Sequence, residues 1–288
     1  MLLNKFMKFA KSERKTILYL LRKEVIPPSR KCYKCKNNMI LDLKRKIFRC
    51  QKKGHEVNIS IFRNTFFSNS NVPINKILQI CYLYLHKSST SEIVKLVGVY
   101  KEAVTDWCTY TRELLADCLD FEEIKIGGPN VIVEIDESKL GKRKYHRGHS
   151  VDGVWVVGGI ERTPYKKCFY IEVADRSAET IQNILNTFIL PGSIIYTDCF
   201  KSYVPSCRNL NFSHLTVNHK ENFVDPITLV HTNTIEGLNN GLKHLIKPRN
   251  RTKKNINGWL FYFIWRRQNK KKIWKGFLKA LKVIKYLN

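Results

Sequence analysis

The feature that most limits how this chain can fold is a change in the spacing of apolar residues near residue 131. Residues 73–120 carry apolar residues at helical spacing, whereas short strand-like runs alternate with helical runs after 131. The predicted strands are 131–137, 154–162, 168–175, 193–198 and 212–217, and the predicted helices are 177–189, 200–207 and 232–247. This order predicts a mixed sheet with helices on both faces, because each element must bury an apolar side against another layer.

The same order of elements is that of the ribonuclease-H-like fold, an α/β fold whose first and fourth strands are parallel neighbours. Asp136 lies at the C-terminal end of the first predicted strand, and Asp198 lies at the end of the fourth. The helix that carries Glu236 is expected to cross the same edge of the sheet. We therefore predict that the three carboxylates converge, although Glu236 is 38 residues from Asp198 and 100 from Asp136.

Three carboxylates gathered in one place require cations between them, because like charges at short distance repel. Oxygen ligands select Mg²⁺ or Mn²⁺. Two such ions, roughly 4 Å apart and bridged by Asp136, would activate the attacking oxygen and stabilise the leaving oxygen of a phosphodiester. The predicted chemistry is therefore displacement at a phosphodiester bond.

Several polar residues near this site also have a plainer interpretation. Glu236 could be an ordinary acid at a helix start, favoured by the helix dipole. Glu137 is predicted to point to the opposite sheet face and to be structural or solvent-facing, because successive strand residues alternate. Asp175 is interpreted as a turn or cap residue. His231 and Asn233 could contact phosphate or orient a ligand, and capping of the helix explains them equally well.

A second candidate metal site lies near the start of the chain. Cys32 and Cys35 form a C-x2-C pair, and Cys50 and His55 form a C-x4-H pair after fourteen intervening residues. Three thiolates and one imidazole suit a structural zinc ion, and a pair of ligands in each of two short loops predicts a zinc ribbon. The alternative is two unrelated cysteine pairs with His55 on the surface. The scattered cysteines, interpreted as buried hydrophobic residues, are Cys81, Cys108, Cys118, Cys168 and Cys207.

The helical region between these two sites has the pattern of a helix-turn-helix unit. Ser89 and Glu92 form a capping box at a helix start, and Gly98 closes that helix. The following helix could lie in a DNA major groove, and a plain helical packing unit is the alternative. The predicted boundaries are 1–30 for an N-terminal helix, 31–70 for the ribbon, 71–128 for the helical unit, 129–250 for the catalytic domain and 251–288 for basic C-terminal helices.

The charge of the chain indicates a polyanionic partner. Lys and Arg number 51 against 24 Asp and Glu, which gives a formal charge of +27. No segment reaches the roughly eighteen apolar residues of a membrane span, so we expect no membrane partner. His146, His149 and His219 are interpreted as DNA-facing loop residues without a metal role. The predicted phosphate contacts are Lys243, Lys247, Arg249, Arg251, Lys253 and Lys254.

At the level of motifs, the chain resembles DDE transposases of the Merlin superfamily and their bacterial insertion-sequence relatives. The resemblance covers roughly residues 20–270 and rests on the cysteine pairs and on the motifs VEIDESKLGKRKYHRG, IIYTDCFKSY, LTVNHKENFVDP and HTNTIEGLNNGLK. It implies a catalytic triad of Asp136, Asp198 and Glu236. The chain departs from its relatives at His55, where they usually have Cys, and after Glu236, where an aromatic residue is common.

The resemblance also implies an activity and partners. A cut-and-paste DNA transposase would act on double-stranded transposon ends and target DNA, use two Mg²⁺ or Mn²⁺ ions and one Zn²⁺, and form a homo-oligomer on DNA. Such a protein is expected in the nucleus of a eukaryote, which is the favoured location, or in the nucleoid of a bacterium. Two alternatives remain open: a catalytically silent DNA-binding protein derived from a transposase, and a nuclease that only hydrolyses.

Overall fold

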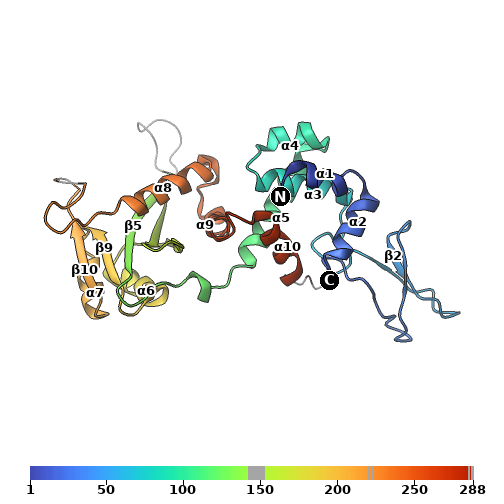
Figure 1. Cartoon of the computed structure of the whole chain (residues 1–288), viewed down its shortest axis with the longest axis horizontal. Helices are drawn as coiled ribbons and strands as arrows, with labels where there is room; N and C mark the ends of the chain where they lie inside the picture. The colour runs from blue at the N-terminus through green and yellow to red at the C-terminus, as the bar shows by residue number, and fades with distance from the viewer. Residues whose placement is uncertain (142–152, 220, 222, 285, 287–288) are drawn as a thin grey trace. The chain divides into compact units, whose positions relative to one another are not determined.

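The structure is a computed structural model that describes residues 1–141, 153–219, 221, 223–284 and 286. The chain forms two compact units, one of Met1–Cys118 with Asn269–Asn288 and one of Leu119–Gln268, coloured along the chain in Figure 1. His146 and His149, interpreted above as DNA-facing, lie outside the described residues. Each unit is therefore considered by itself.

The first unit is mainly helical. Its helices are α1 (Leu3–Ala10), α2 (Glu13–Arg22), α3 (Ile74–Leu85), α4 (Thr90–Val97), α5 (Lys101–Asp117) and α10 (Ile273–Val283). The single predicted N-terminal helix is wrong, because Ser12 interrupts it and accepts a hydrogen bond from the Lys15 backbone N–H at the start of α2. Phe6 stacks on Tyr82 and meets the edge of Trp274, so α1, α3 and α10 share one core.

Two helices, α4 and α5, lie where the sequence predicted either a helix-turn-helix unit or a plain helical packing unit. Ser89 accepts from the Glu92 backbone and Glu92 accepts from the Ser89 backbone, which confirms the capping box. Gly98 ends α4 with a φ of 65°, a left-handed conformation that suits glycine. Helix α5 starts three residues later, so the turn between the two helices is short.

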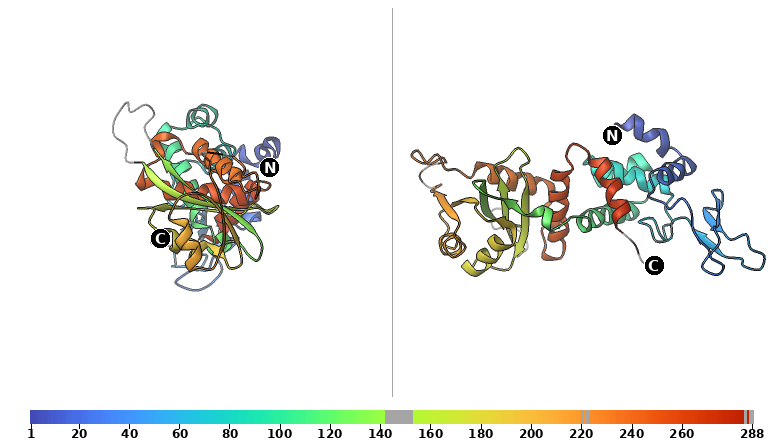
Figure 2. Two further views of the ribbon diagram at one scale, coloured as in Figure 1. Left: turned by 90° about the vertical axis from the view of Figure 1, so that its left-hand side faces the viewer. Right: turned by 60° about the horizontal axis from the view of Figure 1, so that its bottom comes forward.

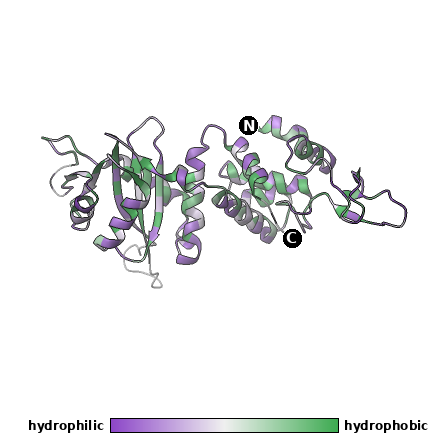
Figure 3. Cartoon of the chain, turned by 90° about the horizontal axis from the view of Figure 1, so that it is seen from below, coloured by the Kyte–Doolittle hydropathy of each residue, from purple (hydrophilic) through white to green (hydrophobic). Residues whose placement is uncertain are grey.

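The second unit is built on a five-stranded mixed sheet of order β10-β9-β5-β6-β7. Its strands are β5 (Ile132–Leu140), β6 (Val154–Glu161), β7 (Cys168–Val173), β9 (Ile194–Asp198) and β10 (Ser213–Val217), and a small parallel pair joins β4 (Ile126–Gly127) to β8 (Ile189–Leu190). Strands β5, β6 and β7 are antiparallel, whereas β9 is parallel to both β5 and β10. The predicted parallel neighbours are thus confirmed, and Figure 3 shows hydrophobic segments, in green, within the sheet of this unit.

Helices cover both faces of this sheet. They are α6 (Ala178–Phe188), α7 (Tyr203–Asn209), α8 (Asn233–Leu245) and α9 (Lys253–Gln268), with short 3-10 turns at Glu122–Ile124 and Pro248–Asn250. Phe169 of β7 stacks on Phe188 of α6, whereas the next residue, Tyr170, contacts α8 and α9. Successive strand residues point to opposite faces, so α6 lies on one side and α8 and α9 on the other (Figure 2).

The predicted boundary near residue 250 differs from the division that the structure gives. Helix α9 packs against β7 and belongs to the second unit, whereas α10 packs against α3 and α5 in the first. The buried aromatic residues of α9, including Tyr262 and Phe263, explain why it joins the sheet and does not form one basic tail with α10. In the described part of the chain, no helix combines the length and apolar character that crossing a membrane requires.

Two adjacent glycines in β6 make room for the aromatic pair of β7. A Cβ atom at Gly158 would lie 2.3 Å from the Tyr170 ring, and one at Gly159 would lie 2.3 Å from the Phe169 ring. Each ring therefore lies flat across the neighbouring strand on its own face of the sheet. In register, Gly158 stands between Asp136 of β5 and Tyr170 of β7.

We predict that Gly158→Ala destabilises the second unit by about 1–3 kcal/mol, because the added methyl group must displace the buried Tyr170 ring. Urea denaturation followed by circular dichroism measures the change. Gly237→Ala is the control: a Cβ there meets nothing within 4 Å, and a helical glycine replaced by alanine stabilises by roughly 0.5–1 kcal/mol. Equal stability of the two variants would contradict the packing argument.

Candidate active site and zinc ribbon

The two aspartates meet as predicted, but the prediction that Asp136 ends its strand is wrong: β5 continues to Leu140, and only Asp198 lies at a strand end. Asp136 of β5 and Asp198 of β9 belong to a group of three carboxylates whose ligand oxygens all lie within 4.8 Å of one another. The third member is Glu137, which follows Asp136 on β5. The Asp198 carboxylate also accepts a hydrogen bond of 2.9 Å from the Phe200 backbone N–H, which fixes its orientation at the end of the strand.

The prediction that Glu137 is a structural or solvent-facing residue away from the site is wrong. The register of β5 with β9 covers only Ile132–Glu134, so the edge of β5 next to Asp198 is open where Glu137 lies. A long side chain at that position can reach the aspartates from either face. Glu137 is half-buried, and its Oε1 atom has no hydrogen-bond partner among the described residues.

Glu236 is not a member of this tight group. It lies in the first turn of α8 with its side chain 44% exposed, and its Oε1 is 3.5 Å from His219 Nε2. The same nitrogen of His219 lies 2.7 Å from the Thr232 hydroxyl. His219, interpreted above as a DNA-facing residue, thus contacts the predicted third ligand. Glu236 is nonetheless near the site: burial and the charge of Asp198 raise the pKa of Asp136, and the charge of Glu236 adds to that increase.

Asn239, one turn after Glu236, links α8 to the first aspartate. Its side-chain nitrogen donates to Asp136 Oδ2 at 2.8 Å, and its side-chain oxygen accepts from the Tyr170 hydroxyl at 2.6 Å. Both Asn239 and Tyr170 are buried. The carboxylate of Asp136 is therefore oriented by a chain of hydrogen bonds that starts on β7.

Glu134 forms a second link between β5 and α8. Its Oε2 atom accepts from the backbone N–H groups of Thr234 and Ile235 at 2.8 and 2.9 Å, and its Oε1 accepts from Arg162 Nε at 2.5 Å. Arg162 in turn donates to the His231 ring and to its backbone carbonyl. A buried carboxylate of β5 thus accepts hydrogen bonds from the first turn of the helix that carries Glu236.

The electrostatics of the three clustered acids favour a cation. Burial raises the pKa of Asp136 from 3.8 to about 6, and the charge of Asp198 adds to the increase. Burial likewise raises the pKa of Glu137 from 4.5 to about 7. Oxygen donors at this spacing, one of them buried and unpaired, fit Mg²⁺ or Mn²⁺.

Two of the plainer interpretations agree with the structure. The Asp175 carboxylate accepts from the Ser177 backbone and from the Thr180 hydroxyl, both at 2.8 Å, which confirms a turn and cap role. His231 Nδ1 accepts from Arg162 and, at 3.4 Å, from the Asn233 backbone N–H. Since arginine can only donate, that nitrogen is the acceptor of the ring, and helix capping accounts for His231.

The six predicted phosphate contacts lie on and after α8. Five of them are exposed: Lys243, Lys247, Arg249, Lys253 and Lys254. Arg251 is half-buried and donates to the backbone carbonyls of Lys243 and Ile246, at 2.6 and 2.9 Å. Its guanidinium therefore satisfies carbonyls at the end of α8, where a cation also complements the helix dipole.

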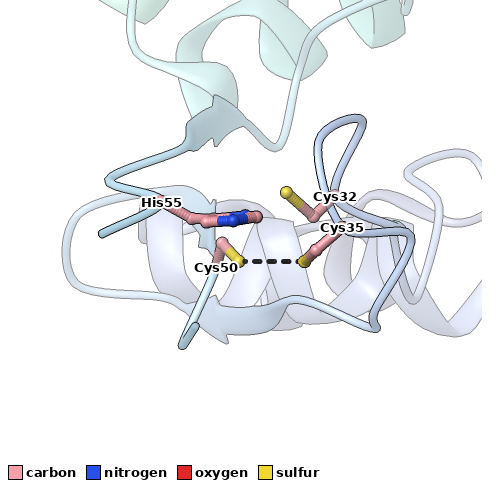
Figure 4. A group of neighbouring side chains, drawn as sticks. All are labelled: Cys32, Cys35, Cys50 and His55. Atoms are coloured by element: carbon pink, nitrogen blue, oxygen red, sulfur yellow. Dashed lines mark hydrogen bonds between the residues drawn. The ribbon is translucent and has the colours of Figure 1, made fainter. Parts of the chain in front are cut away.

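The four predicted zinc ligands come together in the first unit. The ligand atoms of Cys32, Cys35, Cys50 and His55 lie within 4.8 Å of one another, and Figure 4 shows the four side chains converging. Cys35 Sγ and Cys50 Sγ are 3.6 Å apart. Two sulfurs bound tetrahedrally to zinc at about 2.3 Å would lie roughly 3.8 Å apart, so the spacing suits that ion.

A small antiparallel sheet holds these ligands. It has the order β1-β2-β3, formed by Ile40–Asp42, Ile47–Arg49 and Asn58–Ser60. Cys32 and Cys35 lie in a tight loop closed by the Lys31–Asn38 bridge, and Cys50 directly follows β2. This arrangement presents two ligand pairs from two loops, as the spacing predicted.

The local electrostatics also suit a thiolate ligand set. Burial by itself would raise the pKa of the Cys32 thiol. Hydrogen bonds from the Cys35 backbone and from His55 outweigh burial and lower this pKa to about 6. His55 Nδ1 is buried and has no hydrogen-bond partner in the described part of the chain. Of the five cysteines predicted to be buried, four are, and Cys118 is half-buried. The three clustered cysteines are thus different residues from the five that were predicted to pack in the core.

Sequence reasoning missed the residues that orient the site. Glu134 and Asn239 connect β5 with α8, Arg162 and His219 hold the segment that leads into α8, and Tyr170 supports Asn239. One signal was available for Glu134. It is a charged residue between apolar neighbours of a predicted buried strand, and a buried carboxylate requires hydrogen-bond partners.

We predict that the purified protein contains one equivalent of zinc and that Cys35→Ser loses most of it, because three ligands hold zinc far less tightly than four. Elemental analysis by plasma mass spectrometry measures the content. Cys118→Ser, a half-buried cysteine of the same unit outside the cluster, is expected to keep its zinc. Unchanged zinc in Cys35→Ser would contradict the ligand assignment.

The raised pKa values of Asp136 and Glu137 predict a pH-dependent stability in metal-free protein. The folded state favours their protonated forms, so this contribution is complete below about pH 4 and is lost as the pH rises through 6 to 7. The loss is on the order of a few kcal/mol. Urea denaturation across this range, compared with Asp136→Asn, measures it, and the variant is expected to lose less stability.

Asp175→Asn provides a control with the opposite sign. Hydrogen bonds from Ser177 lower the pKa of Asp175, so its contribution is present above the unfolded pKa and is lost as the pH falls. Identical pH profiles for the wild type and Asp136→Asn would contradict the proposed crowding of the three acids.

Comparison with known families agrees with this geometry. Residues 125–266 match the family model described as the ISXO2-like transposase domain, and this range includes the sheet, Asp136, Asp198 and Glu236. None of the curated proteins compared with the chain matches it. The resemblance to DDE transposases is confirmed for the matched region. Residues 125–266 therefore form a transposase domain of the ISXO2-like family.

Proposed function

We propose that the chain cuts and joins DNA ends by metal-dependent phosphodiester transfer, with Asp136, Asp198 and Glu236 as the catalytic carboxylates. The observation that carries this proposal is the meeting of Asp136 and Asp198 on two neighbouring parallel strands inside the matched transposase domain. The strand order β10-β9-β5-β6-β7 supports a ribonuclease-H-like fold for this domain.

Each acid has a distinct role in this proposal. Asp136, held in place by Asn239, and Asp198, oriented by the Phe200 backbone, would together hold the divalent cations. Glu236 completes the site from α8, with His219 beside its carboxylate. Glu137 lies close enough to supply a fourth carboxylate. When bound, Mg²⁺ or Mn²⁺ would activate the attacking oxygen and neutralise charge on the leaving oxygen.

The substrate in this proposal is double-stranded DNA. The formal charge of +27 supports a phosphate partner, and the exposed Lys247, Arg249, Lys253 and Lys254 follow the helix that carries Glu236. The α4–α5 pair supplies a helix of the kind that enters a major groove, and the zinc ribbon stabilises its own small unit. Binding of two DNA ends by a homo-oligomer belongs to the same proposal.

Substitution of the carboxylates tests the assignment. Asp136→Asn, Asp198→Asn and Glu236→Gln are each expected to reduce cleavage by at least about 100-fold, and combining them is expected to add little, because each removes a ligand from one site. Cleavage and joining of a labelled duplex carrying the inverted repeat that flanks the gene, with Mg²⁺ or Mn²⁺, is the measurement. Binding to that duplex is expected to persist or tighten, since repulsion toward phosphate falls.

Two further variants sharpen this test. Asp175→Asn removes an exposed carboxylate that only closes a turn, and it is expected to keep its activity. Glu137→Gln tests whether the third ligand is Glu236 or Glu137. Full activity in Glu236→Gln together with loss of activity in Glu137→Gln would assign that role to Glu137. A wild-type protein that binds the duplex but never cuts it would indicate a silent DNA-binding protein, and cutting without joining would indicate a nuclease.

A further inference from the structure

Helix α8 begins without a cap from its N-cap residue, and the His231 ring just before that residue accepts from the Asn233 backbone N–H at a long 3.4 Å. Thr232, the residue at the N-cap position, makes no side-chain capping hydrogen bond, although the first N–H groups of any helix lack partners inside it. Two of these groups, from Thr234 and Ile235, donate instead to Glu134, which lies 100 residues earlier on β5. The cap of α8 is therefore a residue of the central sheet.

The Glu134 side chain is itself held in place by an ion pair with Arg162. Its side chain is 0% exposed, and its second oxygen accepts from Arg162 Nε. The Arg162 guanidinium also donates to His231 Nδ1 and to the His231 carbonyl, and it lies over the Tyr196 ring at 4.9 Å. The ion pair thus anchors both the first turn of α8 and the residue that precedes it.

The position of Glu134 connects this anchor to the site. Glu134 and Asp136 are two residues apart on β5 and point to the same face of the sheet. Glu236 directly follows Ile235, and the Ile235 backbone N–H donates to the Glu134 carboxylate. The Asn239 bond to Asp136 forms a second attachment one turn further along α8. Glu236 is therefore placed between two attachments that both originate on β5.

The placement of Glu236 depends on these attachments more than on its own contacts. Its side chain is 44% exposed and has the His219 contact at 3.5 Å, a pair that supplies little orienting energy at a solvated site. An anion at the helix start also interacts favourably with the dipole of α8. A shift of the first turn would move Glu236 directly, whereas Asp136 and Asp198 would stay on the sheet.

We propose that Glu134, together with Arg162, is a positioning residue that sets the place of Glu236 relative to Asp136 and thereby the affinity of the site for its divalent cation. This inference rests on the proposed function of the three carboxylates. The alternative is a purely structural role, in which the buried pair stabilises the fold without affecting cation binding.

The chain offers a matched control for the test. Glu161 is also a buried glutamate of the same sheet, and it accepts from the Gly127 backbone and the Thr163 hydroxyl. It pairs in register with Val133, the neighbour of Glu134, so the two glutamates face opposite sides of the sheet. Glu134→Gln and Glu161→Gln thus remove the same charge from similar surroundings, but only the first touches α8.

Mn²⁺ binding to the full-length protein, followed by electron paramagnetic resonance, is the measurement. Glu134→Gln is expected to weaken binding by about 10-fold or more, as substitutions behind a metal ligand commonly do, while Glu161→Gln stays within about twofold of the wild type. Folding of each variant is checked by circular dichroism. If Glu134→Gln does not fold, Arg162→Lys is used, because it keeps a charge near Glu134 but cannot bridge to His231, and it is expected to weaken binding in the same direction.

Wild-type Mn²⁺ affinity in a folded Glu134→Gln or Arg162→Lys, or equal weakening in Glu161→Gln, would overturn the positioning role. The Mn²⁺ binding measurement does not require DNA cleavage. A wild-type protein that binds Mn²⁺ but fails to cut its DNA ends would count against the proposed function and would leave the comparison of the variants intact.

Discussion

The parallel pairing of β5 with β9 is the constraint on which the candidate site depends. Their register runs from Ile132 beside Ile194 to Glu134 beside Tyr196, and Asp136 and Asp198 each lie two residues beyond the last pair. Neighbouring strands are only about 4.8 Å apart, and the ligand oxygens of the three clustered carboxylates all lie within 4.8 Å of one another. Backbone hydrogen bonds thus hold two like charges together, at a distance that flexible loops would increase to relieve their repulsion.

The two candidate metal sites of the chain differ in how they relate to the stability of the fold around them. In the ribbon, too few residues are present to build a core, and a bound ion would supply the missing stability. In the transposase domain a large core already exists, and its stability offsets the electrostatic cost of gathered acids. Burial and the neighbouring acids together raise the pKa values of Asp136 and Glu137, and at Asp136 the hydrogen bond from Asn239 does not cancel the increase.

Patterns of apolar spacing predicted the strands, their order and the meeting of Asp136 with Asp198, because these depend on the repeating geometry of the backbone. The paired cysteines predicted the ribbon for a similar reason: short loops limit where their ligands can lie. The surroundings of the acids could not be predicted in this way. Glu137 reaches the site around an open strand edge, and Glu134 caps a helix 100 residues away, so both depend on tertiary contacts that no local spacing encodes.

The glycine at position 158 has a consequence for how this domain can diverge. Because Tyr170 lies across it and supports Asn239, which orients Asp136, the volume at one strand position limits the chemistry at another. A lineage that acquired a larger residue at 158 would have to replace the tyrosine and then the asparagine to stay functional. Positions 158, 170 and 239 are therefore expected to covary during evolution, although only the side chain at 239 donates a hydrogen bond to the Asp136 carboxylate.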